Sequence, residues 1–277
     1  MQQHMNDTFQ AKKHPAWETA LAKASKHVVH IADTCMRLYG ELLVETFHAL
    51  RSPKTFRRDA LWNAASRIGS RGLGIVGMIS FLIGGTIALQ SAVQLKRLGA
   101  QIYVADLLGI SVTRELGPLM AAILIAGRSG SAIAAELASM SIAEELDALR
   151  SMGISPLRFV VVPNFLAMTV MQPILTTFAN VFALLGGVAV GIWYLDMHAF
   201  DFIDRLYHAL VLKDLMTGLF KSILFAQIIT TVSVTCGIHT QGGPERVGDN
   251  TTLSVVASIF AVIAADATCS LLFYFGT

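Results

Sequence analysis

The chain has 277 residues, of which 54% are hydrophobic and only 14% are charged, and its formal net charge is +2. About a quarter of the residues in soluble domains are charged, so this composition indicates an integral membrane protein. The net charge is small, and aromatic and basic residues are not interleaved, which argues against nucleic-acid binding. Three widely spaced cysteines and eight histidines without metal-ligand spacing predict neither a disulfide framework nor a metal site.

Residues 1–71 are predicted to form cytoplasmic or interfacial amphipathic helices. This region is polar and basic, so it lacks the early apolar core of a cleavable signal peptide. Apolar residues recur every three or four positions from Trp17 to Leu42, which places them on one side of a helix. That side would lie on the membrane surface or, equally, pack against a partner or a second copy. Ser52-Pro53 breaks the pattern. A second short helix is predicted from Phe56, Leu61, Trp62 and Ile68.

Residues 72–277 are predicted to form a transmembrane domain. Five runs approach the roughly twenty apolar residues that cross a hydrocarbon core. They lie near residues 72–93, 107–127, 159–192, 215–238 and 253–275. The third run is too long for an upright span, and Pro163 and Pro173 offer points for a kink or a boundary.

The basic residues outside these spans predict the orientation of the chain. Fifteen Lys and Arg residues lie on the side of the amino terminus, and four lie on the opposite side. The positive-inside rule therefore predicts a cytoplasmic amino terminus and an external carboxyl terminus. The loop before the fourth span, which contains Asp196, Asp201, Asp204 and Asp214, suits the outer face.

The loop between the second and third spans contains a candidate surface helix. Leu146, Leu149 and Met152 could share one face of it. Glu144, Glu145, Asp147 and Arg150 lie beside them in the sequence. Gly153 is a plausible stop. The pattern fits a short helix offered to a partner, and it fits an ordinary solvated connector equally well.

No motif for catalysis or nucleotide binding is present in the sequence. It contains no Gly-Lys pair and therefore no Walker A phosphate loop, and it has no GxSxG elbow. We therefore expect neither enzyme activity nor ATP hydrolysis by this chain alone.

One long string of residues resembles a known family. The run RELGPLMAAILIAGRSGSAIAAELASM, followed by EELDALRSMGISPLRFVVVPNF, resembles the MlaE-type (YrbE-type) permease subunit of ABC transporters that work with MCE proteins. The Lys221-Ser222 pair and Asp266 match as well, and the resemblance extends from about residue 72 to the end of the chain.

The resemblance implies an all-α permease domain over residues 72–277, with five transmembrane helices per copy, that acts as a homodimer in the bacterial inner membrane. A separate cytoplasmic ATPase would bind the ATP, and this chain would carry no cofactor. A periplasmic MCE-domain protein would exchange phospholipid or a related lipid between the inner and outer membranes. The helix at 144–152 would then couple to the ATPase through Glu144, Glu145, Leu146, Leu149, Arg150 and Met152.

Charged residues inside the predicted spans are candidates for the lipid site. Each costs at least about 2.5 kcal/mol to insert, so it normally faces a partner or a wet cavity. Arg114 could bind a phosphate, Lys221 could supply a point charge, and Glu115 could balance them when the cavity is empty. The alternative is a structural ion pair between helices. Adjacent helical residues diverge by about 100°, so Arg114 and Glu115 cannot both face one point.

Two further polar residues are weaker candidates. Asp266 is expected to make a hydrogen-bonded helix contact, with a transport role as the alternative. Gln90 and the Gly84-Gly85 pair could line the cavity, although close helix packing is the favoured interpretation of the glycines. Pro118 predicts a local irregularity just after the charged pair.

Two other classes of function also stay open. One is an ion-coupled carrier that moves protons on Glu115 or Asp266, and the other is a membrane scaffold without transport activity.

Overall fold

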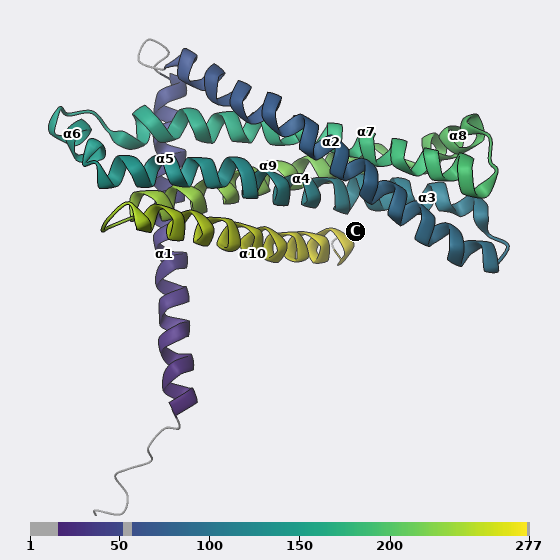
Figure 1. The fold of residues 1–277 in the computed structure, drawn as a ribbon, viewed down its shortest axis with the longest axis horizontal. Coiled ribbons are helices and arrows are strands. Elements are labelled where there is room, and N and C mark those ends of the chain that lie inside the picture. The colour runs from purple at the N-terminus through teal and green to yellow at the C-terminus, as the bar shows by residue number, and fades with distance from the viewer. Residues whose placement is uncertain (1–15, 52–56, 276–277) are drawn as a thin grey trace, which may run out of the picture. The chain divides into compact units, whose positions relative to one another are not determined.

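The computed structural model of the chain describes residues 16–51 and 57–275. Every regular element in these ranges is a helix (Figure 1). The predicted all-α membrane fold is thereby confirmed. The chain divides into two units, Met1–Glu41 and Leu42–Thr277.

The amino-terminal helix α1 (Ala16–Arg51) is 36 residues long, so the helix predicted from Trp17 to Leu42 is confirmed. Its last part belongs to the second unit, where Leu42, Thr46 and Ala49 are buried at helical spacing. The predicted break at Ser52-Pro53, together with Phe56, lies outside the described residues. An interfacial position for α1 stays a prediction.

Five helical segments of the second unit are long and apolar enough to cross a membrane, as predicted. They are Arg58–Arg97, Gln101–Ile142, Leu157–Leu195, Leu212–Ile238 and Glu245–Phe273. The first is the single helix α2 (Arg58–Arg97), so the separate short helix predicted around Trp62 is wrong. Arg67 and Arg71 lower the local hydropathy, but arginine does not interrupt a helical backbone. The helix therefore continues through residues 71 and 72 without a break.

The second segment is a helix interrupted twice by π-helical turns. A short 3₁₀ turn precedes it, and its parts are α3 (Val104–Ser111), the turn Val112–Leu116, α4 (Gly117–Ile125), the turn Ala126–Gly130 and α5 (Ser131–Ile142). The first turn is the irregularity expected near Pro118, which has no backbone N–H to donate to the preceding turn. Turns of this kind are frequent at functional sites.

Short helices lie at opposite ends of the second unit, as Figure 1 shows for α6 (Glu145–Ser151) and α8 (Ala199–Ala209). The helix α8 lies in the aspartate-rich loop before the fourth span. It folds because Phe202 and Leu206, four residues apart, are buried on one side, whereas Asp201 and Asp204 are exposed on the other. The long helix α7 (Val162–Leu195) follows a third π-helical turn, Leu157–Val161. Pro163 lies in the first turn of α7 and Pro173 lies in its interior.

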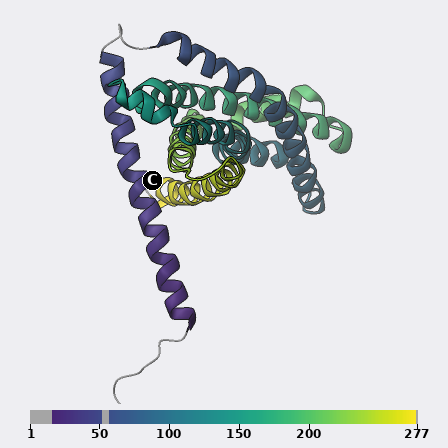
Figure 2. The same ribbon diagram turned by 60° about the vertical axis from the view of Figure 1, so that its left-hand side comes forward.

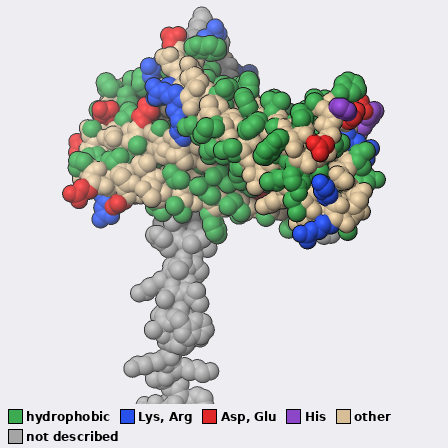
Figure 3. Space-filling model, turned by 45° about the vertical axis from the view of Figure 1, so that its right-hand side comes forward, with side chains coloured by type: hydrophobic (Ala, Val, Ile, Leu, Met, Phe, Trp, Pro, Cys, Tyr) green, Lys and Arg blue, Asp and Glu red, His purple; other side chains and the backbone are tan. Residues whose placement is uncertain are grey.

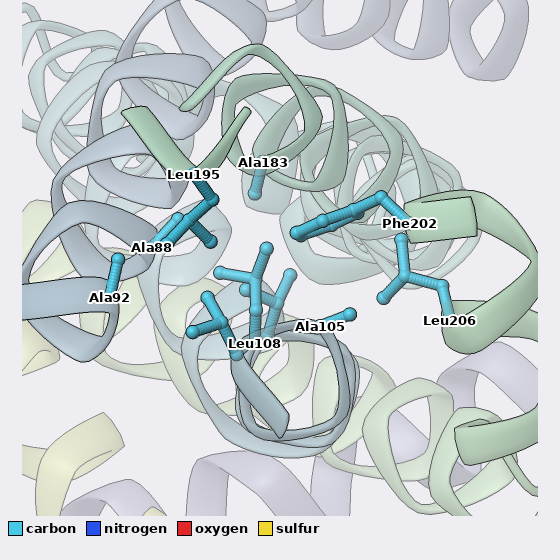
Figure 4. Packing of buried hydrophobic residues seen from close by; sticks show 10 residues of the cluster. Ala88, Ala92, Ala105, Leu108, Ala183, Leu195, Phe202 and Leu206 are labelled. Carbon is cyan, nitrogen blue, oxygen red and sulfur yellow. The ribbon is translucent and has the colours of Figure 1, made fainter. Parts of the chain in front are cut away.

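A tightly packed core joins α2, α3, α7 and α8 (Figure 4). Alanines of α2 and α3 meet Leu195 and Phe202 there, and the ring of Phe202 packs directly on Gly191 of α7. Helices α2 and α7 also approach each other closely, because a Cβ added to Gly84 of α2 would overlap the backbone carbonyl of Ala183 on α7. The favoured packing interpretation of the Gly84-Gly85 pair is thereby confirmed.

Helix α9 (Leu212–Ile238) is followed by α10 (Glu245–Phe275), and Figure 2 shows the two nearly end on, beside each other. In the most apolar 18-residue stretch of each helix, 17% of α10 is buried, against 50% of α9. Figure 3 shows hydrophobic side chains over much of the middle of one face of this unit, with charged side chains toward its two ends. This face of the second unit therefore carries an apolar band between two charged ends, as expected of a membrane protein.

Candidate functional site

The charged side chain of Lys221 is fully buried in the interior of the second unit. It projects from the middle of α9, on the same side as the buried residues Gly218 and Phe225. An unpaired ammonium at such a position would be very costly. Its partners therefore define the most informative site of the molecule.

Three side chains from two other segments surround the Lys221 ammonium. Glu115, in the π-helical turn Val112–Leu116, accepts a hydrogen bond from it. On α10, Asp266 Oδ1 lies 2.9 Å and Ser270 Oγ lies 2.8 Å from Lys221 Nζ. Ser270 Oγ is also within hydrogen-bond distance of Glu115 Oε2, at 3.1 Å, and of the Asp266 carbonyl oxygen, at 2.8 Å. We call these four residues the Lys221 cluster.

The Lys221 cluster is internally satisfied. An ammonium has three N–H donors, and the three contacts of Lys221 use all of them. In this arrangement Lys221 has no donor left for the phosphate of a lipid. With one lysine and two carboxylates the formal charge of the cluster is −1, and Glu115 is its most accessible charged member, with 36% of its side chain exposed. The cluster ties α9, α10 and the π-helical turn together.

Arg114 lies apart from the Lys221 cluster. Its Nη1 is 3.9 Å from Asp214 Oδ1 on α9, a separation too long for a hydrogen bond. The side chain of Arg114 is 29% exposed, whereas that of Asp214 is 12% exposed. The structure therefore brings Glu115 and Lys221 together but sends Arg114 to another partner, as the divergence of adjacent helical residues predicts. Of the three predicted lipid-site residues, only Arg114 has donors that no hydrogen bond to a described residue occupies.

Sequence reasoning missed Ser270 and the pairing role of Asp214. Ser270 follows Asp266 by four residues, which places the two on one face of α10, so helical spacing was the available signal. Nothing in the sequence pairs Arg114 with Asp214, which are 100 positions apart. Gln90 is exposed on α2 and is not part of the Lys221 cluster.

The residues predicted to couple to an ATPase lie on and around the seven-residue helix α6. Glu144, Glu145, Arg150 and Met152 are exposed, whereas Leu146 is buried against the protein and Leu149 is partly buried. Gly153, the predicted stop, has a φ of +73°, a conformation that glycine adopts without strain. A helix is therefore present at the predicted place, and its coupling role stays a prediction.

Comparison with known proteins places these features in a family. Residues 61–272 match the family model described as Permease MlaE. A probable ABC transporter permease protein of Rickettsia felis is 33% identical over 207 residues, which cover 75% of this chain and 80% of that protein. A probable ABC transporter permease protein of Synechocystis is 33% identical over 221 residues, or 80% of this chain and 84% of the relative.

A third relative comes from a plant. Protein TRIGALACTOSYLDIACYLGLYCEROL 1, chloroplastic, of Arabidopsis thaliana is 30% identical over 210 residues, which cover 76% of this chain and 60% of that protein. The family match reaches into all five membrane segments and includes every member of the Lys221 cluster. The chain belongs to the MlaE family of ABC transporter permeases.

Proposed function

We propose that two copies of this chain form a permease that moves phospholipid or a related lipid between the inner and outer membranes of a bacterium. A separate cytoplasmic ATPase supplies the energy, and a periplasmic MCE-domain protein exchanges the lipid. In this proposal the chain lies in the inner membrane with its amino terminus in the cytoplasm and its carboxyl terminus in the periplasm.

The observation that carries the proposal is the placement of Arg114 and Glu115 in one π-helical turn of a membrane segment. Both side chains are partly exposed, although the segment around them is apolar. A lipid site needs broad apolar walls with a few polar groups that hold the head group. Arg114, held only loosely by Asp214 at 3.9 Å, is the residue we assign to the phosphate. Glu115 and Lys221 belong to the separate Lys221 cluster, which holds the π-helical turn that carries Arg114 against α9 and α10.

The exposed side of α10 supports a second copy as the partner. Leu253, Val256, Phe260 and Ile263 are between 49% and 77% exposed and follow one another at spacings of three and four residues. We assign this exposed row to a second copy of the chain, whose α10 would present the same row in return. A dimer formed along α10 would place both Lys221 clusters near the contact, because Asp266 and Ser270 lie on the same helix.

The exposed part of α6 is the surface that we assign to the ATPase. Glu145 and Met152 are both exposed, while Leu146 anchors the helix to the rest of the chain. An anchored helix with an exposed polar face can transmit a movement of the ATPase to the membrane segments on either side of it.

The plant relative supports the lipid assignment, because its name includes that of a diacylglycerol lipid.

Purification of the tagged full-length chain in mild detergent, followed by mass spectrometry of bound proteins and lipids, tests the proposal. We expect an ABC-type ATPase and phospholipid to co-purify with the chain. Glu145→Arg should release the ATPase and leave the lipid, whereas the matched variant Asp201→Arg on α8 should release neither. Recovery of neither an ATPase nor a lipid with the unmodified chain would overturn the proposal.

One observation favours a second candidate function. Two carboxylates, Glu115 and Asp266, share the single ammonium of Lys221 within the membrane segments, and carboxylates within membrane segments serve as proton relays in pumps and transporters. In an ion-coupled carrier, protons that move down their gradient would drive the transport of the substrate, and no nucleotide would be needed. Transport by this chain alone, in vesicles that contain no ATPase, would support that function and contradict ours.

A further inference from the structure

A second charged site lies away from the Lys221 cluster, where α2, α5 and α7 meet. It is a cavity of about 100 Å³ lined by Arg67 and Arg71 of α2, Arg128 and Ser129 of the π-helical turn Ala126–Gly130, Glu136 of α5 and Asn164 of α7. We call it the arginine pocket. Ser129 and Asn164 are buried, with exposures of 6% and 7%, so the lining includes buried polar residues as well as the charged ones.

The charges of the arginine pocket are unbalanced. Arg67 Nη1 lies 3.6 Å from Glu136 Oε2, and both side chains are about half exposed. The guanidinium groups of Arg71 and Arg128 make no hydrogen bond or ion pair with any residue in the part of the chain that the structure describes. Three arginines and one glutamate leave a formal charge of +2 around a small cavity. The pocket therefore suits an anion of high charge density.

The position of the pocket along α2 indicates where such an anion comes from. From Ile75 onward the exposed residues of α2 include large apolar side chains such as Met78 and Phe81. Arg71 precedes Ile75 by one helical turn, or about 6 Å at a rise of 1.5 Å per residue. Trp62, which is 77% exposed, precedes Arg67 and Arg71 along α2, so the two arginines lie between it and the apolar part of the helix. Arginines beside an exposed tryptophan at the edge of an apolar belt are typical of the depth at which lipid phosphates lie.

We propose that the arginine pocket binds the phosphate of an anionic phospholipid, which stays bound at the junction of the three helices. Arginine favours phosphate because its planar guanidinium donates two parallel hydrogen bonds. Basic pockets between transmembrane helices are a recurring form of anionic-lipid site. This site is separate from the transport site assigned to Arg114. It requires only that the chain lies in a membrane, so it does not rest on the proposed function.

Lipid binding to the purified assembly tests this proposal. The assembly, stripped of lipid by detergent exchange, is titrated with phosphatidylglycerol, with phosphatidylcholine or with inorganic phosphate, while native mass spectrometry records bound lipid and a thermal scan records Tm. We expect phosphatidylglycerol to bind and raise Tm more than phosphatidylcholine or phosphate does. Arg71→Gln and Arg128→Gln should each weaken phosphatidylglycerol binding about fivefold, the effect of removing one basic residue near a membrane surface.

Two further variants sharpen the test. Arg97→Gln removes the same charge from an exposed position at the opposite end of α2 and should leave phosphatidylglycerol binding unchanged. Glu136→Gln removes the competing carboxylate and should strengthen binding. Equal binding of both lipids, an equal effect of free phosphate, or unchanged binding by Arg71→Gln would each overturn the proposal. Loss of the ATPase rather than of lipid in Arg71→Gln would instead assign the pocket to a protein contact and overturn it too.

Discussion

Lys221 Nζ on α9 lies 2.9 Å from Asp266 Oδ1 on α10, and the same ammonium donates a hydrogen bond to Glu115 in the π-helical turn Val112–Leu116. One buried side chain therefore joins the second, fourth and fifth membrane segments. Because all three of its donors are used within the cluster, its first role is to hold these segments together.

We expect Lys221→Met to destabilise the protein by about 3–5 kcal/mol, because it leaves two carboxylates without a counter-charge inside the membrane segments. Thermal unfolding of the purified protein, followed by tryptophan fluorescence, measures the loss. Lys213→Met is the matched control, since Lys213 lies on the same helix but is exposed. A Lys221→Met protein that melts with the control would show that the cluster does not support the fold.

Arg114→Gln should behave in the opposite way. A pair at 3.9 Å with a partly exposed arginine contributes little, so the change in stability should stay within about 1 kcal/mol. Crosslinking of a photoreactive phospholipid to the reconstituted permease should fall strongly if Arg114 holds the phosphate. Crosslinking at the level of the unmodified protein would return Arg114 to a purely structural role.

The sequence carried enough information for the number of spans but not for their inner geometry. All five segments follow from apolar runs, since length and hydropathy decide whether a helix crosses a membrane. The start of α2 at Arg58, well before the predicted residue 72, could not be read from hydropathy, because charged residues end an apolar run without ending a helix. Pro118 indicated an irregularity, but the backbone register that results depends on how α4 packs.

The candidate site was predictable only in part for a similar reason. Insertion cost identifies Arg114, Glu115, Lys221 and Asp266 as unusual, whichever partners they find. Partner choice depends on the rotation of α9 and α10 against the second segment, and the packing of small residues sets that rotation. Gly218, for example, lets α9 approach the backbone of Thr113, because a Cβ there would overlap the Thr113 carbonyl. No local pattern reveals such a contact in advance.

Close packing of α2 on α7 makes a further prediction. Gly84→Leu should destabilise the protein by at least about 1–3 kcal/mol, because the new side chain would meet the backbone of Ala183, which cannot move aside as a side chain can. Gly74→Ala is the control on the same helix, since a Cβ at Gly74 meets nothing within 4 Å. The two variants are compared by their Tm in one detergent. Equal Tm values would contradict this packing.

A buried glutamine on α7 gives a prediction of the opposite sign. Gln172 is fully buried, and neither its Nε2 nor its Oε1 has a hydrogen-bond partner among the described residues. Gln172→Met removes both groups at similar volume and should stabilise the protein by about 1–3 kcal/mol. A rise in Tm checks this expectation. A lower Tm would mean that the amide is satisfied in the membrane-embedded protein by water or by a second copy.

Transfer of a fluorescent phospholipid in proteoliposomes tests the central claim, that this chain is a lipid permease driven by a separate ATPase. The account predicts transfer only when the chain, its co-purified ATPase and ATP are all present, and loss of transfer in Glu145→Arg. Transfer by the chain alone, driven by a proton gradient and unaffected by ATP, would contradict it.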